Sequence, residues 1–335
     1  MPIKNLSVSH YAPTAYNANT LPDQPPAIVQ RNDGFSERLP WGNTEPVIPA
    51  HLMAGSDLIE LARREKTYKK LQSLTGLYDE AFNHIEMRPA SFTKMATFWM
   101  YAYSLGKGLS FIMFAGVIFV YVFSYFADKN YSVSEIFFKY LPTLTVYQGI
   151  PIAIWILSAL YFKLFGFRKG QGSKWALNRQ TGRVTIYQQQ GEKDQKKRIA
   201  IEKPFYEFDA YLMTLLNRQG FAYYTLYLQH RYQKELLIKD LLDNEVGNKQ
   251  EAYAMWFFIQ NYMDTSQPLP ELGDLELFRP YDPKTIEYDK QSARNPRYWR
   301  DMPYELWQSK CEEMAKQVFK LKLNSDNIMA KHVQY

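Results

Sequence analysis

Two long apolar runs are the strongest feature of the hydrophobic pattern. Residues 108–127 form an uncharged run, and residues 146–166 form a second run with one lysine, Lys163, near its end. A helix rises about 1.5 Å per residue, so about 20 apolar residues cover the hydrocarbon core of a bilayer, which is about 30 Å thick. The pattern predicts two transmembrane helices, over residues 96–127 and 146–166, joined by an external loop at 128–145.

Charged residues beside these runs predict the orientation of the spans. Basic side chains lie before the first run and after the second, whereas the loop at 128–145 balances two lysines with two acidic residues. Basic residues are retained on the cytoplasmic side of a membrane, so we expect a multi-pass protein with both termini in the cytoplasm. Arg168, Lys169 and Lys174 directly follow the second run and are the candidate contacts to lipid headgroups.

The segment before the first span divides into an arm and a helix. Residues 1–55 are rich in proline and polar residues, which predicts an extended arm that packs on a neighbouring surface through Trp41 and Val47–Ile48. Residues 56–95 include apolar positions at helical spacing, which predicts an amphipathic helix over 56–87. Two interpretations stay open for it: packing against the folded domain or a second helix, or lying on anionic lipid.

After the second span the pattern changes to short alternating segments. Residues 174–178 and 183–188 flank a turn that contains Gly182, which predicts a β-hairpin, and further strands follow up to residue 239. Residues 249–264 form an amphipathic helix. We therefore expect an α+β cytoplasmic domain over 167–265, an antiparallel sheet capped by a helix, with the strand pattern of the pleckstrin-homology-like fold.

The C-terminal part, residues 266–335, is predicted to be a proline-rich strap followed by a helix over 303–323. Apolar residues in the strap offer anchors to the domain. The expected fold class is thus a membrane α-helical hairpin of two spans plus this α+β domain.

Composition and charge narrow the possible partners. The 335 residues include 40 Lys and Arg and 34 Asp and Glu, for a net charge of +6. Because charges of both signs are interspersed, the basic balance predicts membrane topology and no nucleic-acid partner. Cys311 is the only cysteine, which excludes a disulfide within the chain.

Motifs for catalysis or cofactor binding are not evident. The glycines of residues 166–174 imitate a phosphate-binding loop, but the order is Gly-Ser-Lys and a strand is predicted to follow, so nucleotide binding is not expected. The five histidines lack the spacing of a metal site, and Cys311 is read as a small apolar residue of the last helix. We expect no metal, no cofactor and no enzymatic activity.

Several segments after the spans resemble a family of bacterial inner-membrane proteins that have two spans and a C-terminal soluble domain and are often encoded near type VI secretion effectors. The resemblance rests on residues 175–179 (WALNR), 181–183 (TGR), Tyr187, 256–264 (WFFIQNYMD), 268–270 (PLP), 279–283 (RPYDP) and 295–299 (NPRYW). It implies location in the inner membrane and a role as an immunity protein that neutralises a cognate toxin, or as an accessory to toxin delivery.

Three hypotheses about function follow. The first is the immunity or accessory protein, which binds a toxin or a secretion component through its cytoplasmic domain. The second is a membrane-tethered scaffold or lipid-sensing module without a toxin partner. The third is an enzyme or transporter whose site forms only in three dimensions.

Overall fold

The computed structural model describes most of the chain. The described residues are 10–29, 35–42, 44–54, 82–89, 94–127, 135, 147–161, 173–190, 197–216, 218–239, 241, 246–323 and 326–335. They form two compact units, which are treated separately below. Unit 1 comprises residues 1–89 and 174–335, and unit 2 comprises residues 90–173.

The first sheet of unit 1 contains the predicted hairpin. β3 pairs antiparallel with β4, with Trp175 opposite Ile186, and the strand order is β2-β3-β4-β5. Gly182 in the turn has φ +65°, and a Cβ there would lie 2.5 Å from the carbonyl oxygen of Thr14. The turn therefore requires glycine, because the N-terminal arm passes directly against it. The strands are β2 (Glu86–Met87), β3 (Trp175–Asn178), β4 (Arg183–Gln190) and β5 (Lys197–Pro204).

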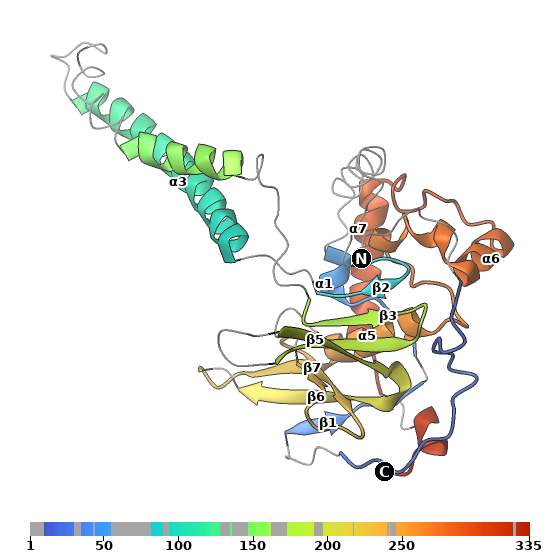
Figure 1. Cartoon of the computed structure of the whole chain (residues 1–335). Coiled ribbons are helices and arrows are strands. Elements are labelled where there is room, and N and C mark those ends of the chain that lie inside the picture. Colours follow the sequence, from blue (N-terminus) through green and yellow to red (C-terminus); the bar gives the residue numbers. More distant parts are fainter. Residues whose placement is uncertain are drawn as a thin grey trace. The chain divides into compact units, whose positions relative to one another are not determined.

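The second sheet has the order β1-β6-β7-β8 and is also antiparallel (Figure 1). The 3-10 turn η1 (Phe205–Glu207) separates β5 from β6, so the strands divide between two sheets where the sequence predicted one. Phe208, Leu212 and Leu228 are buried in the core. The strands are β1 (Ser36–Arg38), β6 (Phe208–Leu216), β7 (Ala222–His230) and β8 (Leu237–Ile238).

Helix α5 (Lys249–Met263) lies in the core of unit 1. Its N-cap is Asn248, whose side chain accepts a hydrogen bond from the backbone N–H of Glu251. The helix packs against β6, β7 and α7 (Tyr304–Lys320), and Trp256 is fully buried. A helix surrounded in this way is apolar on most of its surface, which agrees with the residues 252–259.

The C-terminal strap is more structured than the sequence predicted. It contains two short 3-10 turns and a helix that the sequence did not indicate, α6 (Pro283–Gln291), whose N-cap is Asp282, and a third 3-10 turn follows α7. The anchors expected in the strap are buried, among them Leu272, Phe278 and Trp299. The elements are η2 (Gly273–Leu275), η3 (Arg279–Tyr281), α6 (Pro283–Gln291), α7 (Tyr304–Lys320) and η4 (Ile328–Lys331).

The N-terminal arm packs on unit 1 as predicted. Trp41, Val47 and Ile48 are all buried, and the short helix α1 (Ala50–Ala54) contacts α7. The arm also meets the C-terminus, because the backbone N–H of Ala27 donates to the carbonyl of Gln334. The arm around residue 27 and the C-terminal residues thus pack on each other in unit 1.

The amphipathic helix expected over 56–87 is wrong at its C-terminal end. Residues 83–85 form a bend, Glu86–Met87 is strand β2, and Phe82 forms a bridge to Met87. Residues 86–87 pair with β3 and extend the first sheet, and this pairing outweighs the helical spacing of the apolar residues in the sequence. Residues 55–81 lie outside the described part of the chain, as do most of the residues of the expected loop at 128–145.

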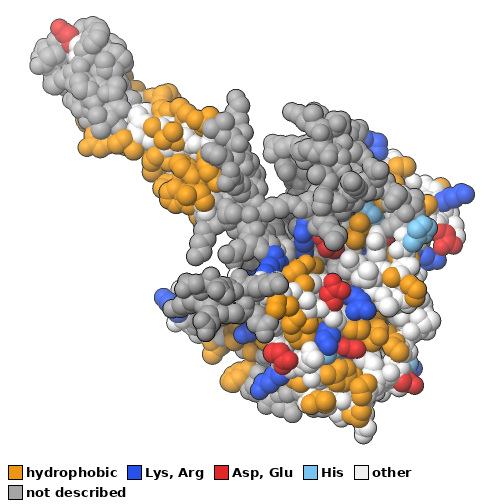
Figure 2. All heavy atoms as spheres, in the orientation of Figure 1, with side chains coloured by type: hydrophobic (Ala, Val, Ile, Leu, Met, Phe, Trp, Pro, Cys, Tyr) orange, Lys and Arg blue, Asp and Glu red, His pale blue; other side chains and the backbone are white. Residues whose placement is uncertain are grey.

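Unit 2 consists of α3 (Lys94–Ala127) and a helical segment at 147–161. The two helices pack closely, because a Cβ at Gly106 would lie 2.8 Å from the backbone nitrogen of Trp155. The rings of Trp99 and Tyr161 stack at 5.2 Å. Large apolar side chains are exposed along α3, and Figure 2 shows them as a concentration of orange atoms on this unit.

The predicted membrane spans are contradicted by this structure. Among the described residues, no helix has both the length and the apolar character that crossing a bilayer requires. The two-span hairpin, the multi-pass inner-membrane localisation and the fold class built on them were therefore wrong.

Candidate functional site

The candidate site is a cavity of about 550 Å³ in unit 1. Its walls are formed by the N-terminal arm around residues 42–48 and, more than 200 positions later, by the C-terminal end of α5 and the strap at 266–271 that directly follows it. This volume lies within the range of about 300–1,000 Å³ that is usual for ligand sites. The walls mix apolar residues such as Val47 and Leu269 with polar ones.

The arm wall is held in place by buried aromatic packing and by two polar contacts. Trp41 lies edge-on to Phe205 and Trp256, with 4.9 Å between ring centroids in each pair. The backbone N–H of Gly42 donates to Gln260 Oε1 at 2.8 Å. Thr44 donates to the side chain of Asn261 at 2.6 Å. The wall is therefore fixed to α5 before any ligand enters.

Asp264 caps the C-terminal end of α5 and lines the cavity. Its Oδ1 accepts hydrogen bonds from the backbone N–H of Ala18 and from both the N–H and the hydroxyl of Ser266, at 2.8–3.3 Å. These bonds join the arm, the helix end and the strap at one carboxylate oxygen.

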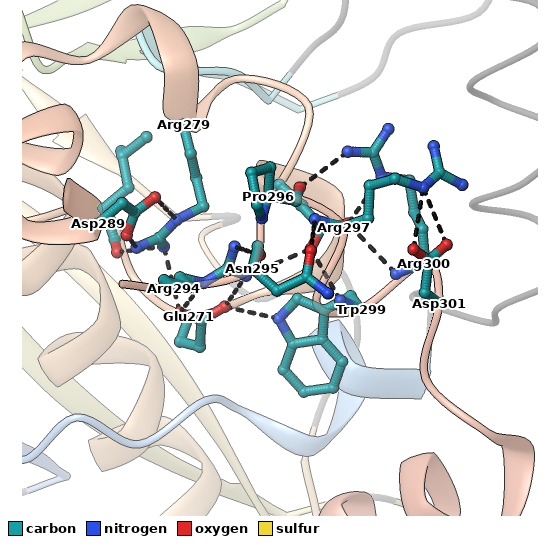
Figure 3. A network of polar contacts seen from close by, with 12 residues as sticks. Glu271, Arg279, Asp289, Arg294, Asn295, Pro296, Arg297, Trp299, Arg300 and Asp301 are labelled. Atoms are coloured by element: carbon teal, nitrogen blue, oxygen red, sulfur yellow. Dashed lines mark hydrogen bonds and ion pairs between the residues drawn. The ribbon is translucent and has the colours of Figure 1, made fainter. Parts of the chain in front are cut away.

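The strap wall is stabilised by a network of ion pairs around Glu271 (Figure 3). Glu271 accepts two hydrogen bonds from the guanidinium of Arg294 and one from the indole N–H of Trp299 at 2.8 Å. Figure 3 shows Arg279 facing Asp289, and the Nε of Arg279 donates to that carboxylate at 2.8 Å. Arg279 is nearly fully buried, and its charge is balanced inside the protein by the carboxylate of Asp289.

Glu276 continues the network behind the cavity. Its carboxylate is fully buried and accepts from the backbone N–H groups of Trp299 and Arg300 and from the Arg300 side chain. A buried carboxylate is stable only when its oxygens are hydrogen-bonded, as here. The contacts bind residues 271–276 to 294–300 and keep the strap in one conformation.

A second buried ion pair stabilises the junction between α5 and the strap. Arg179 donates to Asp282 at 2.9 Å, and both side chains are fully buried. Arg179 also donates to the carbonyl oxygens of Tyr262, Asp264 and Gln267. Because two of these residues line the cavity, this guanidinium fixes the junction between α5 and the strap.

Asp282 of this pair and the nearby His84 both have pKa values displaced from their ordinary range. Burial alone would raise the pKa of Asp282, but the charge of Arg179 and hydrogen bonds from Arg179, Thr285 and Tyr11 outweigh it and hold the pKa below its usual range. Burial lowers the pKa of His84 to about 4. The ring of His84 lies 5.9 Å from that of Phe278, and its Nδ1 has no hydrogen-bond partner among the described residues.

The residues predicted from the sequence do not form this site. Arg168 and Lys169 lie outside the described residues. Lys174 lies at a different cavity, of about 440 Å³, beside Trp175 and Tyr187. Cys311 is half-buried, and burial raises the pKa of its thiol, so its reactive thiolate form is disfavoured. Within the described ranges, no group of histidine, cysteine or acidic residues is arranged to hold a metal ion.

Sequence reasoning missed Asp264, Glu271 and Arg279 as site residues. Asp264 and Arg279 lie inside two of the motifs that carry the family resemblance, but those motifs were read as structural. A charged residue within a strongly apolar segment, such as Asp264 after 252–263, was the available signal.

Comparisons with protein-family models, curated proteins and solved structures find no match to this chain. The resemblance described from the sequence therefore stays a prediction, and the site is interpreted from its own geometry.

Proposed function

We propose that the protein acts by binding a partner protein, and that a segment of this partner occupies the cavity between the arm and the strap. The observation that carries the proposal is the preformed shape of this cavity. Buried ion pairs and aromatic contacts fix all three walls, so little conformational freedom is lost when a ligand binds. Sites of this kind bind tightly because they are preorganised.

The chemistry of the walls favours binding over catalysis. Glu271 and Arg279 are engaged in ion pairs with Arg294 and Asp289, so neither is available as an acid or a base. No histidine, cysteine or lysine is among the described residues of the lining. The Ser266 hydroxyl donates to Asp264 Oδ1, but among the described lining residues there is no histidine or lysine to act as the general base that usually activates a serine.

The family resemblance supports a toxin as the partner, with neutralisation as the outcome. A cognate toxin would present the segment that enters the cavity. This part of the proposal is tested by co-expressing the chain with the product of a neighbouring effector gene and scoring survival and co-purification. Absence of both protection and a complex would remove the toxin as the partner. The membrane-tethered scaffold is not retained, because the spans on which it depended are contradicted.

The cavity itself is tested by peptide selection on the full-length chain. Peptides selected from a random displayed library are measured against two variants. Asn19 is exposed at the cavity, so Asn19→Trp places a bulky ring in the opening. Arg218 is exposed in the β6–β7 turn, and Arg218→Trp is the matched control. We expect the selected peptides to lose at least tenfold in affinity for the first variant and less than twofold for the control. Equal affinity for both variants would contradict the proposal.

A further inference from the structure

Asp264 is the one acidic side chain of the cavity lining that is not part of an ion pair among the described residues. Its side chain is buried, with 7% of the residue exposed. All three of its recorded hydrogen bonds go to Oδ1, and no partner is recorded for Oδ2 within the described part of the chain. One carboxylate oxygen of this cavity-lining residue is therefore without a partner among the described residues.

Among the described residues, neither nearby arginine forms an ion pair with this carboxylate. Arg179 donates to the backbone carbonyl of Asp264 and forms its ion pair with Asp282. Arg279 lines the same cavity, but its guanidinium is paired with Asp289 and lies 3.4 Å from Glu271. A buried carboxylate without a counter-ion is costly, and a cation that enters the cavity relieves this cost.

The remaining walls suit a basic side chain with an aliphatic stem. Tyr288 lines the cavity and is 47% exposed, so its ring can accept a cation on its face. Val47, Leu269 and Ile328 supply apolar contact for the methylene groups of lysine or arginine. Shape and charge in the cavity thus favour the same type of ligand.

We propose that the cavity recognises a lysine or arginine side chain on the partner segment, and that the cation pairs with Asp264 Oδ2. This inference rests on the proposed function and adds the chemical class of the segment. An ammonium or guanidinium donating to a carboxylate forms a short, charge-assisted hydrogen bond, which is stronger than a neutral one.

The test uses the full-length protein and blocked pentapeptides of the form Ala-Ala-X-Ala-Ala, measured by isothermal titration calorimetry. X is lysine, arginine, norleucine or glutamate. We expect the lysine and arginine peptides to bind at least tenfold more tightly than the norleucine peptide, and the glutamate peptide to bind most weakly. Norleucine has nearly the stem of lysine without the charge, so this ratio isolates the cation. Equal binding of lysine and norleucine peptides would overturn the inference.

Asp264→Asn is the decisive variant, because its side-chain oxygen can keep the three hydrogen bonds of Oδ1 while the charge is removed. We expect it to reduce the preference for lysine over norleucine to below twofold. Glu287→Gln is the control: Glu287 is an exposed carboxylate on α6 that pairs with Lys284, and its loss leaves the preference unchanged. If Asp264→Asn still preferred lysine over norleucine, the cation would bind a group other than Asp264, and the inference would be wrong.

The outcomes separate this inference from the proposed function. If selected peptides lose affinity for Asn19→Trp but show no preference for basic residues, the cavity binds a segment and the inference about its charge is wrong. If basic peptides bind equally to Asn19→Trp and to the parent protein, the cavity is not the site and both proposals fail. Binding of free butylamine with the affinity of the lysine peptide would indicate a small-amine site and overturn recognition of a peptide.

Discussion

Replacing Arg179 by methionine tests whether the buried ion pair organises the cavity. Methionine has a similar length and no charge, so the packing volume changes little. The substitution leaves the carboxylate of Asp282 buried without its counter-ion. It also removes the donors to the carbonyl oxygens of Tyr262, Asp264 and Gln267.

The magnitude follows from these losses. Removing one partner of a buried ion pair costs about 3–5 kcal/mol, because the other charge stays buried. Asp282 retains hydrogen bonds from Tyr11 and Thr285, which reduce this penalty. The carbonyl oxygens that lose their donors add to it, at about 1 kcal/mol or more each. We therefore expect Arg179→Met to lower the free energy of unfolding by about 3–5 kcal/mol or more.

The assay is equilibrium unfolding in urea, followed by tryptophan fluorescence. Arg297→Met is the control, because Arg297 forms an exposed pair with Asp301 and such pairs contribute less than about 1 kcal/mol. Adding Asp282→Asn to Arg179→Met removes the buried carboxylate charge that has lost its counter-ion. The loss in free energy of unfolding for the double variant is therefore expected to be smaller than the sum of the losses for the two single variants. A loss below 1 kcal/mol for Arg179→Met would refute this reasoning.

Three further predictions concern stability. The folded state favours the neutral form of His84, so the free energy of unfolding falls as the pH drops from the ordinary pKa of 6.5 toward 4. His84→Phe should remove about 3 kcal/mol of this loss, measured by comparing parent and variant unfolding at pH 7 and at pH 4. Identical pH profiles for the two proteins would contradict this prediction. Gly182→Ala forces a Cβ into the arm backbone at a positive φ and should lower stability by about 2 kcal/mol or more in urea titration, whereas an unchanged midpoint would show that the arm does not pack there. Asn248→Ala removes the α5 N-cap and should lower stability by about 1 kcal/mol in the same titration, and no change would mean that the cap is replaced.

The elements that sequence reasoning predicted well are those with local signals. The β3–β4 hairpin follows from two alternating segments around Gly182, and α5 follows from helical spacing after the cap at Asn248. The anchors Trp41 and Val47–Ile48 were visible as apolar residues in a polar arm. In each case the determining residues lie within about 20 positions of one another.

The parts that were not predicted depend on distant contacts. The division into two sheets occurs at η1, where alternation continues across Pro204 and gives no sign of a break. Strand β1 is three polar residues that become a strand only by pairing with β6. The apolar runs of unit 2 resembled spans because hydrophobicity does not distinguish helices that pack on each other from helices in lipid.

The candidate site could not be located from the sequence for the same reason. Its walls come from residues 42–48 and 264–271, which are more than 200 positions apart. The charges that support these walls, at Arg179 and Glu276, lie in a polar turn and in the strap, where nothing in the sequence indicates that they are buried. Burial and pairing decide the role of these residues, and neither is encoded in spacing.

Hydrogen–deuterium exchange of the full-length protein with and without a selected lysine-containing peptide tests the central claim most directly. The account predicts that the peptide slows exchange at residues 44–48 of the arm and at 266–271 of the strap, with little change in β6, β7 or α3. Protection confined to other surfaces, with exchange in both cavity walls unchanged, would contradict the claim that this cavity holds the partner segment.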